Sequence, residues 1–359
     1  MPATQATPDS AMTPVDFARN VRRSGSLLAT LDSVRFYLLR LGVAHVPGVR
    51  TLLASRDLRI ILYAALGVML GATCSVLAPV WLFLWAPLIL GVPHLLADLR
   101  YLVFDPLARA RLGRADALGG MLLIGALISS TPAVGCSAVL AWVLLTPALR
   151  RGKPHVGRLV LTGVMCAAAI WLSLLHPIFT AYALVHAHNL VALWLFGAMF
   201  RYQRITWLML GGAAVMTGAI LLGVFDTLSD HRAALEALSY NLVPPALAQS
   251  WNPVYNARIV VAFVFLQGMH YTVWLRLVPE AARPREGVRG FASSARALKA
   301  DMGALTLWAT AGLGLGLIGY GLSTGAYAAR GTYLQIAGFH AYLELAVLAR
   351  WWCMKDARA

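Results

Sequence analysis

The stretch Tyr182-Ala-Leu-Val-His-Ala-His-Asn-Leu-Val-Ala-Leu-Trp194 places two histidines and an asparagine inside an apolar run that extends from about Pro177 to Phe200. The run is long enough to cross a bilayer as a single helix. Ionisable side chains at membrane depth are costly, so they tend to face the protein interior and serve a function. His186 and His188 therefore predict a buried functional site inside a membrane-spanning bundle.

The composition indicates the same class of protein. Of the 359 residues, 59% are apolar and only 13% are charged, which is too hydrophobic for an ordinary soluble domain. Apolar runs of spanning length, or close to it, occur at residues 58–77, 79–100, 115–130, 132–149, 157–175, 177–200, 205–225, 258–278, 303–323 and 331–352. We therefore predict an all-α, polytopic transmembrane helical bundle with about ten spans.

The net charge of +15 is distributed as short basic clusters between apolar runs. A nucleic-acid-binding domain would gather these residues on one soluble face, so we expect no nucleic-acid partner. Basic clusters follow every second predicted span, at residues 100–114, 150–158, 201–204, 276–299 and 350–358. The positive-inside rule then predicts that both termini are cytoplasmic, in an integral protein of a bacterial cytoplasmic (inner) membrane.

The other segments are expected to flank the bundle or to connect its helices. We divide the chain into a disordered cytosolic leader (1–25), an interfacial amphipathic helix broken near Pro47 (26–56), the transmembrane bundle (57–353) with an extracytoplasmic segment (226–257), and a cytosolic tail (354–359). The leader lacks the apolar core of a signal peptide.

Three further spans carry a histidine, in Gly91-Val-Pro-His-Leu-Leu-Ala-Asp98, Gln267-Gly-Met-His-Tyr271 and Gly338-Phe-His-Ala-Tyr-Leu-Glu344. In the predicted topology all the histidine-bearing spans run inward, so their depths can be compared. His94, His270 and Glu344 each lie six residues before an arginine, which is about 9 Å from the inner boundary at ~1.5 Å per residue. His340 lies about one turn deeper and His188 deeper still, an offset that helix tilt can partly absorb. We expect one cluster in the inner half of the membrane.

The spacing within two of these spans favours a metal site. His94 and Asp98, and likewise His340 and Glu344, are four residues apart and share a helical face. A carboxylate one turn away can orient a histidine ring or ligate the metal itself. Imidazole and carboxylate without thiolate suit iron, zinc, copper or manganese, and open coordination positions suit non-haem Fe(II). Asp98 and Glu344 are the candidate catalytic side chains.

The candidate metal ligands are His94, His186, His188, His270 and His340. His186 and His188 are two residues apart, which on a helix turns them about 200° from each other. Only one can readily face a single centre unless the helix unwinds. We favour His188, because Asn189 beside it can supply a hydrogen bond to the site.

The segment Pro93-His94-Leu-Leu-Ala-Asp98 resembles the Pro-His-x-x-x-Asp signature of the bacterial Brp/Blh family of membrane β-carotene 15,15′-dioxygenases. The pair His186 and His188 is similar to that family's two-histidine helix, although the spacing here is closer. The resemblance implies an iron ion held by intramembrane histidines and cleavage of a long polyene by dioxygen. It implies that His94 is a ligand and Asp98 its orienting partner, and it covers about two helices.

These observations predict a membrane-embedded, histidine-ligated metalloenzyme, an oxidoreductase of the non-haem iron oxygenase or desaturase type. Its substrate would be a lipophilic molecule, a carotenoid, another isoprenoid or a lipid, that enters from the surrounding membrane lipid. Two alternatives stay open. A b-type haem protein needs only two facing histidines as axial ligands, and a proton-coupled transporter can relay protons through histidine and glutamate near the midplane.

Overall fold

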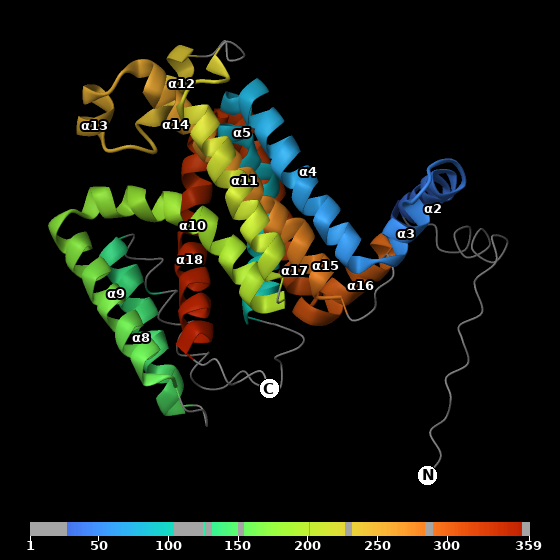
Figure 1. Ribbon diagram of the computed structural model, residues 1–359, viewed down its shortest axis with the longest axis horizontal. Helices are drawn as coiled ribbons and strands as arrows, with labels where there is room; N and C mark the ends of the chain where they lie inside the picture. Colours follow the sequence, from blue (N-terminus) through green and yellow to red (C-terminus); the bar gives the residue numbers. More distant parts are fainter. Residues whose placement is uncertain are drawn as a thin grey trace. The chain divides into compact units, whose positions relative to one another are not determined.

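The computed structural model describes residues 27–103, 125, 131–149, 154–200, 202–226, 232–283 and 290–353 (Figure 1). In these ranges every regular element is helical and no strand occurs, which confirms the all-α prediction. The helices long and apolar enough to cross a membrane number seven among the described residues, at Arg56–Leu77, Pro79–Val103, Val156–Leu175, Pro177–Gly197, Arg204–Leu221, Pro253–Ala281 and Ala304–Thr324. They indicate an integral membrane protein.

The chain forms two compact units. The first, Met1–Arg59 with Arg285–Gly303, contains α2 (Leu27–His45), α3 (Val49–Ala54) and α16 (Phe291–Met302). The Asp32 carboxylate of α2 accepts hydrogen bonds from the first two backbone N–H groups of α16, at 2.6 and 3.0 Å. A carboxylate satisfies N–H groups that a helix start leaves unpaired. The break expected near Pro47 falls between α2 and α3, where Gly48 has φ 82°.

The second unit, Ile60–Pro284 with Ala304–Ala359, contains the histidine-bearing helices. Its elements are most of α4 (Arg56–Leu77), then α5 (Pro79–Ala86), η1 (Pro87–Gly91), α6 (Val92–Asp98), η2 (Leu99–Val103), α8 (Pro132–Leu149), α9 (Val156–Leu175), α10 (Pro177–Phe200), α11 (Gln203–Leu221), α12 (Arg232–Ser239), α13 (Pro245–Ser250), α14 (Pro253–Thr272), η4 (Val273–Leu277), α15 (Val278–Ala281), α17 (Ala304–Thr324) and α18 (Ala326–Cys353).

Helices occupy nine of the ten predicted apolar runs. The run at 115–130 lies outside the described residues, apart from Gly125. The apolar part of α8, Pro132–Leu145, is shorter than a full span. The helix α18 has 28 residues and begins before the predicted apolar run. Its first turns contain Arg330, so hydropathy alone does not identify them as part of the span. The number of spans therefore stays a prediction.

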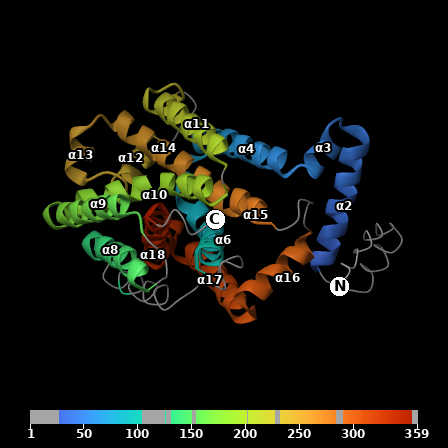
Figure 2. The same ribbon diagram turned by 60° about the horizontal axis from the view of Figure 1, so that its bottom comes forward.

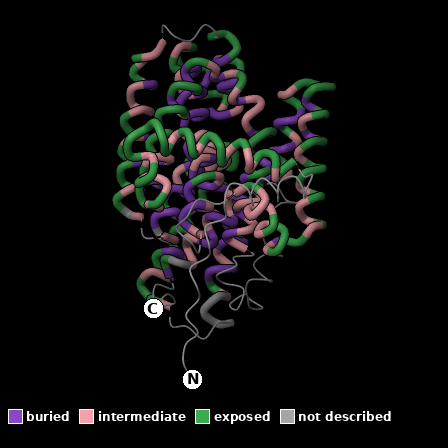
Figure 3. Tube along the Cα trace, turned by 90° about the vertical axis from the view of Figure 1, so that its right-hand side faces the viewer, coloured by how far each residue is buried: buried purple, intermediate pink, exposed green. Residues whose placement is uncertain are grey.

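The helices α14 and α18 form the centre of the second unit. α18 packs against α8, α9, α10 and α17 and against the α5–η1–α6 segment, and Figure 2 shows it running between these neighbours. Two thirds of the α14 span is buried. In Figure 3 the buried positions follow the helix faces that meet one another, while exposed positions face outward. Polar side chains on α14 and α18 are therefore held inside the bundle.

Wide helical turns flank the histidines of α6 and α14. The segments η1, η2 and η4 have π-type geometry, a form that often marks functional sites. Pro87 and Pro93 lie in or beside η1, and Pro279 follows η4. Proline has no N–H to donate to the preceding turn and crowds that turn's carbonyl, which explains why the regular pattern widens here.

The segment expected outside the bundle contains the short helices α12 and α13, and α12 packs on α14. The Tyr182 hydroxyl donates to the Tyr240 carbonyl at 2.9 Å, and that of Tyr327 donates to Asn241 Oδ1 at 2.9 Å. Arg258 of α14 donates hydrogen bonds to both carboxylate oxygens of Asp226, at 3.0, 3.2 and 2.5 Å. These bonds attach the segment and its entry turn to α10, α14 and α18.

Candidate metal centre

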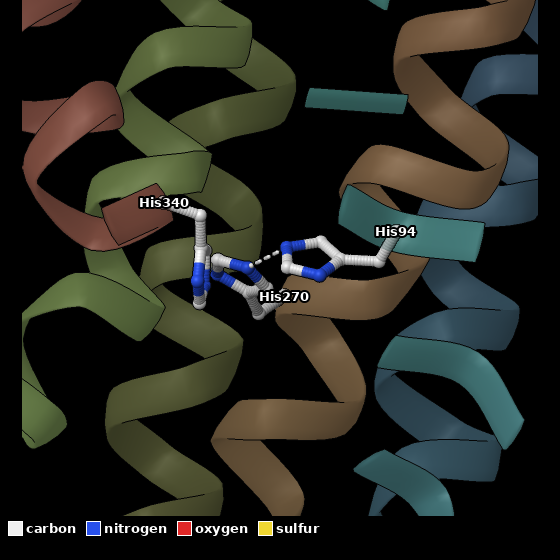
Figure 4. A group of neighbouring side chains, drawn as sticks. All are labelled: His94, His270 and His340. Carbon is white, nitrogen blue, oxygen red and sulfur yellow. Dashed lines mark hydrogen bonds between the residues drawn. The ribbon is translucent and has the colours of Figure 1, made fainter. Parts of the chain in front are cut away.

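His94, His270 and His340 meet inside the second unit (Figure 4). They come from α6, α14 and α18 and are 1%, 1% and 8% exposed. One ring nitrogen from each lies within 4.8 Å of the other two, and Nε2 of His94 is 2.7 Å from Nε2 of His270. Two nitrogen ligands of one tetrahedral ion are about 3.3 Å apart at ~2.05 Å per bond. The His94–His270 pair would therefore have to open slightly, and the widest pair would have to close by no more than about 1.5 Å, for all three nitrogens to ligate one ion.

Two carboxylates border this triad. Asp98 Oδ2 is 3.2 Å from Nε2 of His94, and Glu344 Oε1 is 3.6 Å from Nε2 of His270. Both side chains are fully buried. His94, Asp98 and Glu344 also form a second group with metal-ligand spacing, so His94 belongs to both groups.

Nε2 of His94 has two close polar neighbours, Nε2 of His270 and Oδ2 of Asp98. It carries either one proton or one lone pair, so it can form one full hydrogen bond or share one between the two neighbours. A cation among these atoms would instead attract all three as ligands.

The charge balance points the same way. No lysine or arginine of the described ranges forms a salt bridge with Asp98 or Glu344, and Asp98 Oδ1 and Glu344 Oε2 have no hydrogen-bond partner there. Burying an ionised carboxylate without a partner costs several kcal/mol by order of magnitude. If both carboxyls are ionised they carry a charge of −2, which one divalent cation would neutralise.

The tautomer of His340 follows from its backbone contact. Nδ1 of His340 hydrogen-bonds the Ala337 carbonyl, which requires the proton to be on Nδ1. Nε2 of His340 then carries a lone pair, and no described residue hydrogen-bonds it. A neutral imidazole whose first nitrogen donates to a carbonyl is the form in which histidine ligates metals.

His188 lies beside the triad, whereas His186 does not. The ring of His188 is 5.0 Å from that of His270 and 5.3 Å from that of His340, centre to centre. Its Nδ1 donates to the Val185 carbonyl at 2.8 Å, so Nε2 is the nitrogen left to ligate. His186 instead hydrogen-bonds the Leu242 carbonyl at 3.0 Å and packs on Phe263. The α10 helix does not unwind, so only one of the two faces the site.

Two expected contacts differ in the structure. Asn189 is buried, but its amide hydrogen-bonds no described residue, and the expected bond to His188 is not formed. Glu344 approaches His270 on the neighbouring helix rather than His340 on its own helix. The i,i+4 interaction predicted for both pairs is formed by His94 and Asp98.

Trp274, which the sequence places near the site as a packing or pocket-lining residue, donates its indole N–H to Glu344 Oε1 at 2.7 Å. Trp274 is fully buried and lies one helical turn after His270, a spacing that puts both on one face. Tyr333 is a site neighbour that the sequence pattern does not indicate. A side chain at Gly91 would overlap the end of the Tyr333 ring, so glycine at this position lets Tyr333 pack against the turn before His94.

The described side chains thus form a buried, histidine-rich and carboxylate-rich donor set. Comparison with protein-family models, curated proteins and solved structures finds no match to this chain.

Proposed function

We propose that this chain is an integral membrane metalloenzyme that uses a histidine-ligated metal ion to oxidise a lipophilic substrate. The observation that carries the proposal is the convergence of buried imidazoles and two uncompensated carboxylates at one point of a membrane bundle. Ionisable groups at membrane depth are rarely retained without a function.

The roles of the residues follow from their contacts. His94, His270 and His340 would hold the ion, and His188 lies where it can join them. Asp98 and Glu344 would balance the charge and orient the rings of His94 and His270. Trp274 would fix the Glu344 carboxylate. The surrounding apolar helices exclude water, which strengthens every charge interaction in the site.

Fe(II) is the metal we favour, because a histidine-rich site with open positions suits iron that activates dioxygen. Zinc, copper and manganese accept the same donors. The Pro-His-x-x-x-Asp segment, with its resemblance to the Brp/Blh dioxygenases, supports an oxygenase or desaturase and a carotenoid, isoprenoid or lipid substrate. A bis-histidine haem is less compatible with the geometry, since the rings pack at 4.6–6.0 Å and would have to separate to admit a macrocycle.

The topology belongs to the same proposal. We place the protein in the inner membrane of a bacterial cell, with ten spans and both termini in the cytoplasm. This topology agrees with the basic clusters on alternate connections. Reporter fusions after residues 226 and 353 test this, since the first should report the outside and the second the cytoplasm.

The experiment that tests the function is elemental analysis of the detergent-purified protein together with its absorption spectrum. We expect about one or two equivalents of a transition metal and no Soret band. Oxygen consumption with carotenoid and lipid substrates then tests the chemistry. A Soret band would identify a haem protein, and absence of metal after reconstitution would overturn the proposal.

Single substitutions locate the metal. His94→Ala, His270→Ala and His340→Ala should each abolish bound metal, because each removes a ligand from a site that has few alternatives. His186→Ala is the matched control, since it removes a histidine two residues from His188 that lies outside the cluster. Metal content that survives all three ligand substitutions would disprove a shared site.

A further inference from the structure

A groove runs along the outer side of α14, between α4 and the α5–η1 segment, with a volume of about 360 Å³. Its lining is mostly apolar and includes Leu66, Leu70, Leu82, Leu90 and Val264. These helices belong to candidate membrane spans, so the groove opens toward lipid. The volume is at the small end of the ~300–1,000 Å³ range of ligand pockets.

The helix register gives the groove a direction and a length. Arg276 lies over the ring of Tyr63, 4.3 Å from its centre, at one end, and Cys74 and Val264 line the other end. Tyr63 to Cys74 is eleven residues of α4, about 16 Å at ~1.5 Å per residue. This is close to half of the ~30 Å hydrocarbon thickness of a bilayer, which is the depth that one acyl chain occupies.

The charge along the groove is uneven. Among the described residues that line the groove, Arg276 is the only lysine or arginine, and in the proposed topology it lies at the cytoplasmic boundary. A guanidinium at a membrane interface recognises a carboxylate or phosphate through charge-assisted hydrogen bonds. The apolar remainder of the groove accepts hydrocarbon.

The groove and the metal centre share a wall. Tyr271 lines the groove, and its ring lies 5.4 Å from that of His94, centre to centre. Gln267, which also lines the groove, donates a hydrogen bond to the Tyr271 hydroxyl at 3.2 Å. Tyr271 therefore borders both the groove and the histidine cluster.

We propose that the groove binds a single-chain amphiphile with an anionic head group, with the head at Arg276 and the chain along α4 toward Cys74. In an enzyme of the proposed type this is where the substrate is held, with Tyr271 between its chain and the metal. That role rests on the proposed function. Binding itself does not, because no groove residue is a candidate ligand.

The test is a titration of the chelator-treated, detergent-purified protein with oleic acid, followed by native mass spectrometry. We expect one equivalent of oleate to bind. Arg276→Gln should weaken oleate binding about tenfold or more, as expected for loss of a charge-assisted hydrogen bond, and leave oleyl alcohol unaffected. Arg204→Gln, at an exposed arginine of α11, is the matched control.

A second pair of variants tests the location. Leu70→Trp should fill the groove and prevent binding, whereas Leu208→Trp, on an exposed position of α11, should not. Leu90→Trp, on the opposite wall, replaces Leu70→Trp if the latter does not fold. Equal binding by oleate and oleyl alcohol would overturn the anionic head. Exclusive binding of phosphatidylglycerol or β-carotene would overturn the single anionic chain. Oleate binding that persists in the folded Leu70→Trp variant, or in Leu90→Trp where that one replaces it, would overturn the groove.

The two proposals fail separately. If the protein binds oleate but never retains metal, the groove proposal stands and the proposed enzyme function is rejected. If it retains metal but does not bind oleate, the enzyme proposal stands and the groove proposal is rejected.

Discussion

Nε2 of His94 is the atom at which the contacts of the candidate metal centre meet, since it faces His270 at 2.7 Å and Asp98 at 3.2 Å. The carboxylates differ in how they are supported. Glu344 receives an indole N–H from Trp274, whereas Asp98 has His94 as its close polar neighbour. Removing the Trp274 indole should therefore affect metal affinity through Glu344, whereas removing the His94 ring would affect it through Asp98.

Trp274→Phe should weaken metal binding about 10–100-fold, the usual effect of losing a group that orients a ligand or its partner. The substitution keeps an aromatic ring in the core but leaves Glu344 Oε1 without its donor. Chelator competition measures the affinity. Trp194→Phe, at a half-exposed tryptophan of the helix that carries His188, is the control. Equal affinity for Trp274→Phe and the unmodified protein would show that the hydrogen bond does not support the site.

At the scale of the element, the wide turn η1 affects which way His94 of α6 faces. A π-type turn adds a residue to the helix and rotates everything after it. In α6, His94 follows η1 and Asp98 precedes η2. The pair keeps its i,i+4 contact while the turns on both sides adjust its direction.

Pro93→Ala should restore a backbone N–H that can donate to residue 89 and favour a regular α-helix. His94 would then rotate away from His270, and bound metal should fall by at least about tenfold, an effect comparable to losing an orienting group, although the helix content stays the same. Metal analysis and circular dichroism on one sample check this. Pro253→Ala, at the first turn of α14, is the matched control. A variant that keeps its metal would show that Pro93 does not set the position of His94.

The connection after α11 contains a pH-sensitive contact. The Arg258 guanidinium, hydrogen-bonded to Asp226, lowers the pKa of that carboxyl, with a smaller contribution from the charge of Arg232. A carboxyl whose folded pKa lies below its unfolded value stabilises the fold above the unfolded pKa, near ~3.9. That contribution is lost as pH falls through the folded pKa. Both side chains are about one quarter exposed, so solvent reduces the effect.

Asp226→Asn should therefore lower the thermal midpoint slightly at pH 7 and by less near pH 3, because the stabilisation shrinks as pH falls below the unfolded pKa toward the lowered folded pKa. Thermal unfolding in detergent at both pH values measures the difference. The matched control is Asp32→Asn, on a carboxylate for which the partners are backbone N–H groups of α16. A midpoint difference for Asp226→Asn that is equal at both pH values would exclude the ion pair as its cause.

At the scale of the whole molecule, spacing along a single helix predicts which side chains share a depth or a face. It does not predict how one helix is rotated against another. The shared six-residue offset of His94, His270 and Glu344 from arginine places them at one depth, and the structure brings them together. The 200° argument correctly allows only one of His186 and His188. That Glu344 faces His270 instead of His340 depends on how α18 is rotated against α14, and this is decided by packing across the bundle.

Hydropathy likewise identified the helices but not their full extent. The nine runs within the described ranges are helical. The charged residue Arg330 interrupts the apolar pattern in the first turns of α18, so the predicted run begins after them. In the bundle Arg330 is 5% exposed and lies over the ring of Phe83. Only the tertiary neighbour explains how a guanidinium is tolerated there.

If the site holds a metal as proposed, the two buried carboxylates should make the stability of the whole bundle depend on it. Without metal, Asp98 and Glu344 must be ionised without a cation or take up protons, and both options cost free energy. The double variant Asp98→Asn with Glu344→Gln removes that cost and also removes the charge that attracts the metal. In metal-free samples we expect the double variant to unfold at the same temperature as the unmodified protein or above it. In samples with free metal a hundredfold above Kd, the unmodified protein should gain about 3 kcal/mol and become the more stable of the two. Thermal unfolding of both proteins with and without metal measures this reversal.

If the unmodified protein is the more stable one under both conditions by the same margin, the carboxylates stabilise the fold by themselves and the charge-balance argument for a metal is wrong.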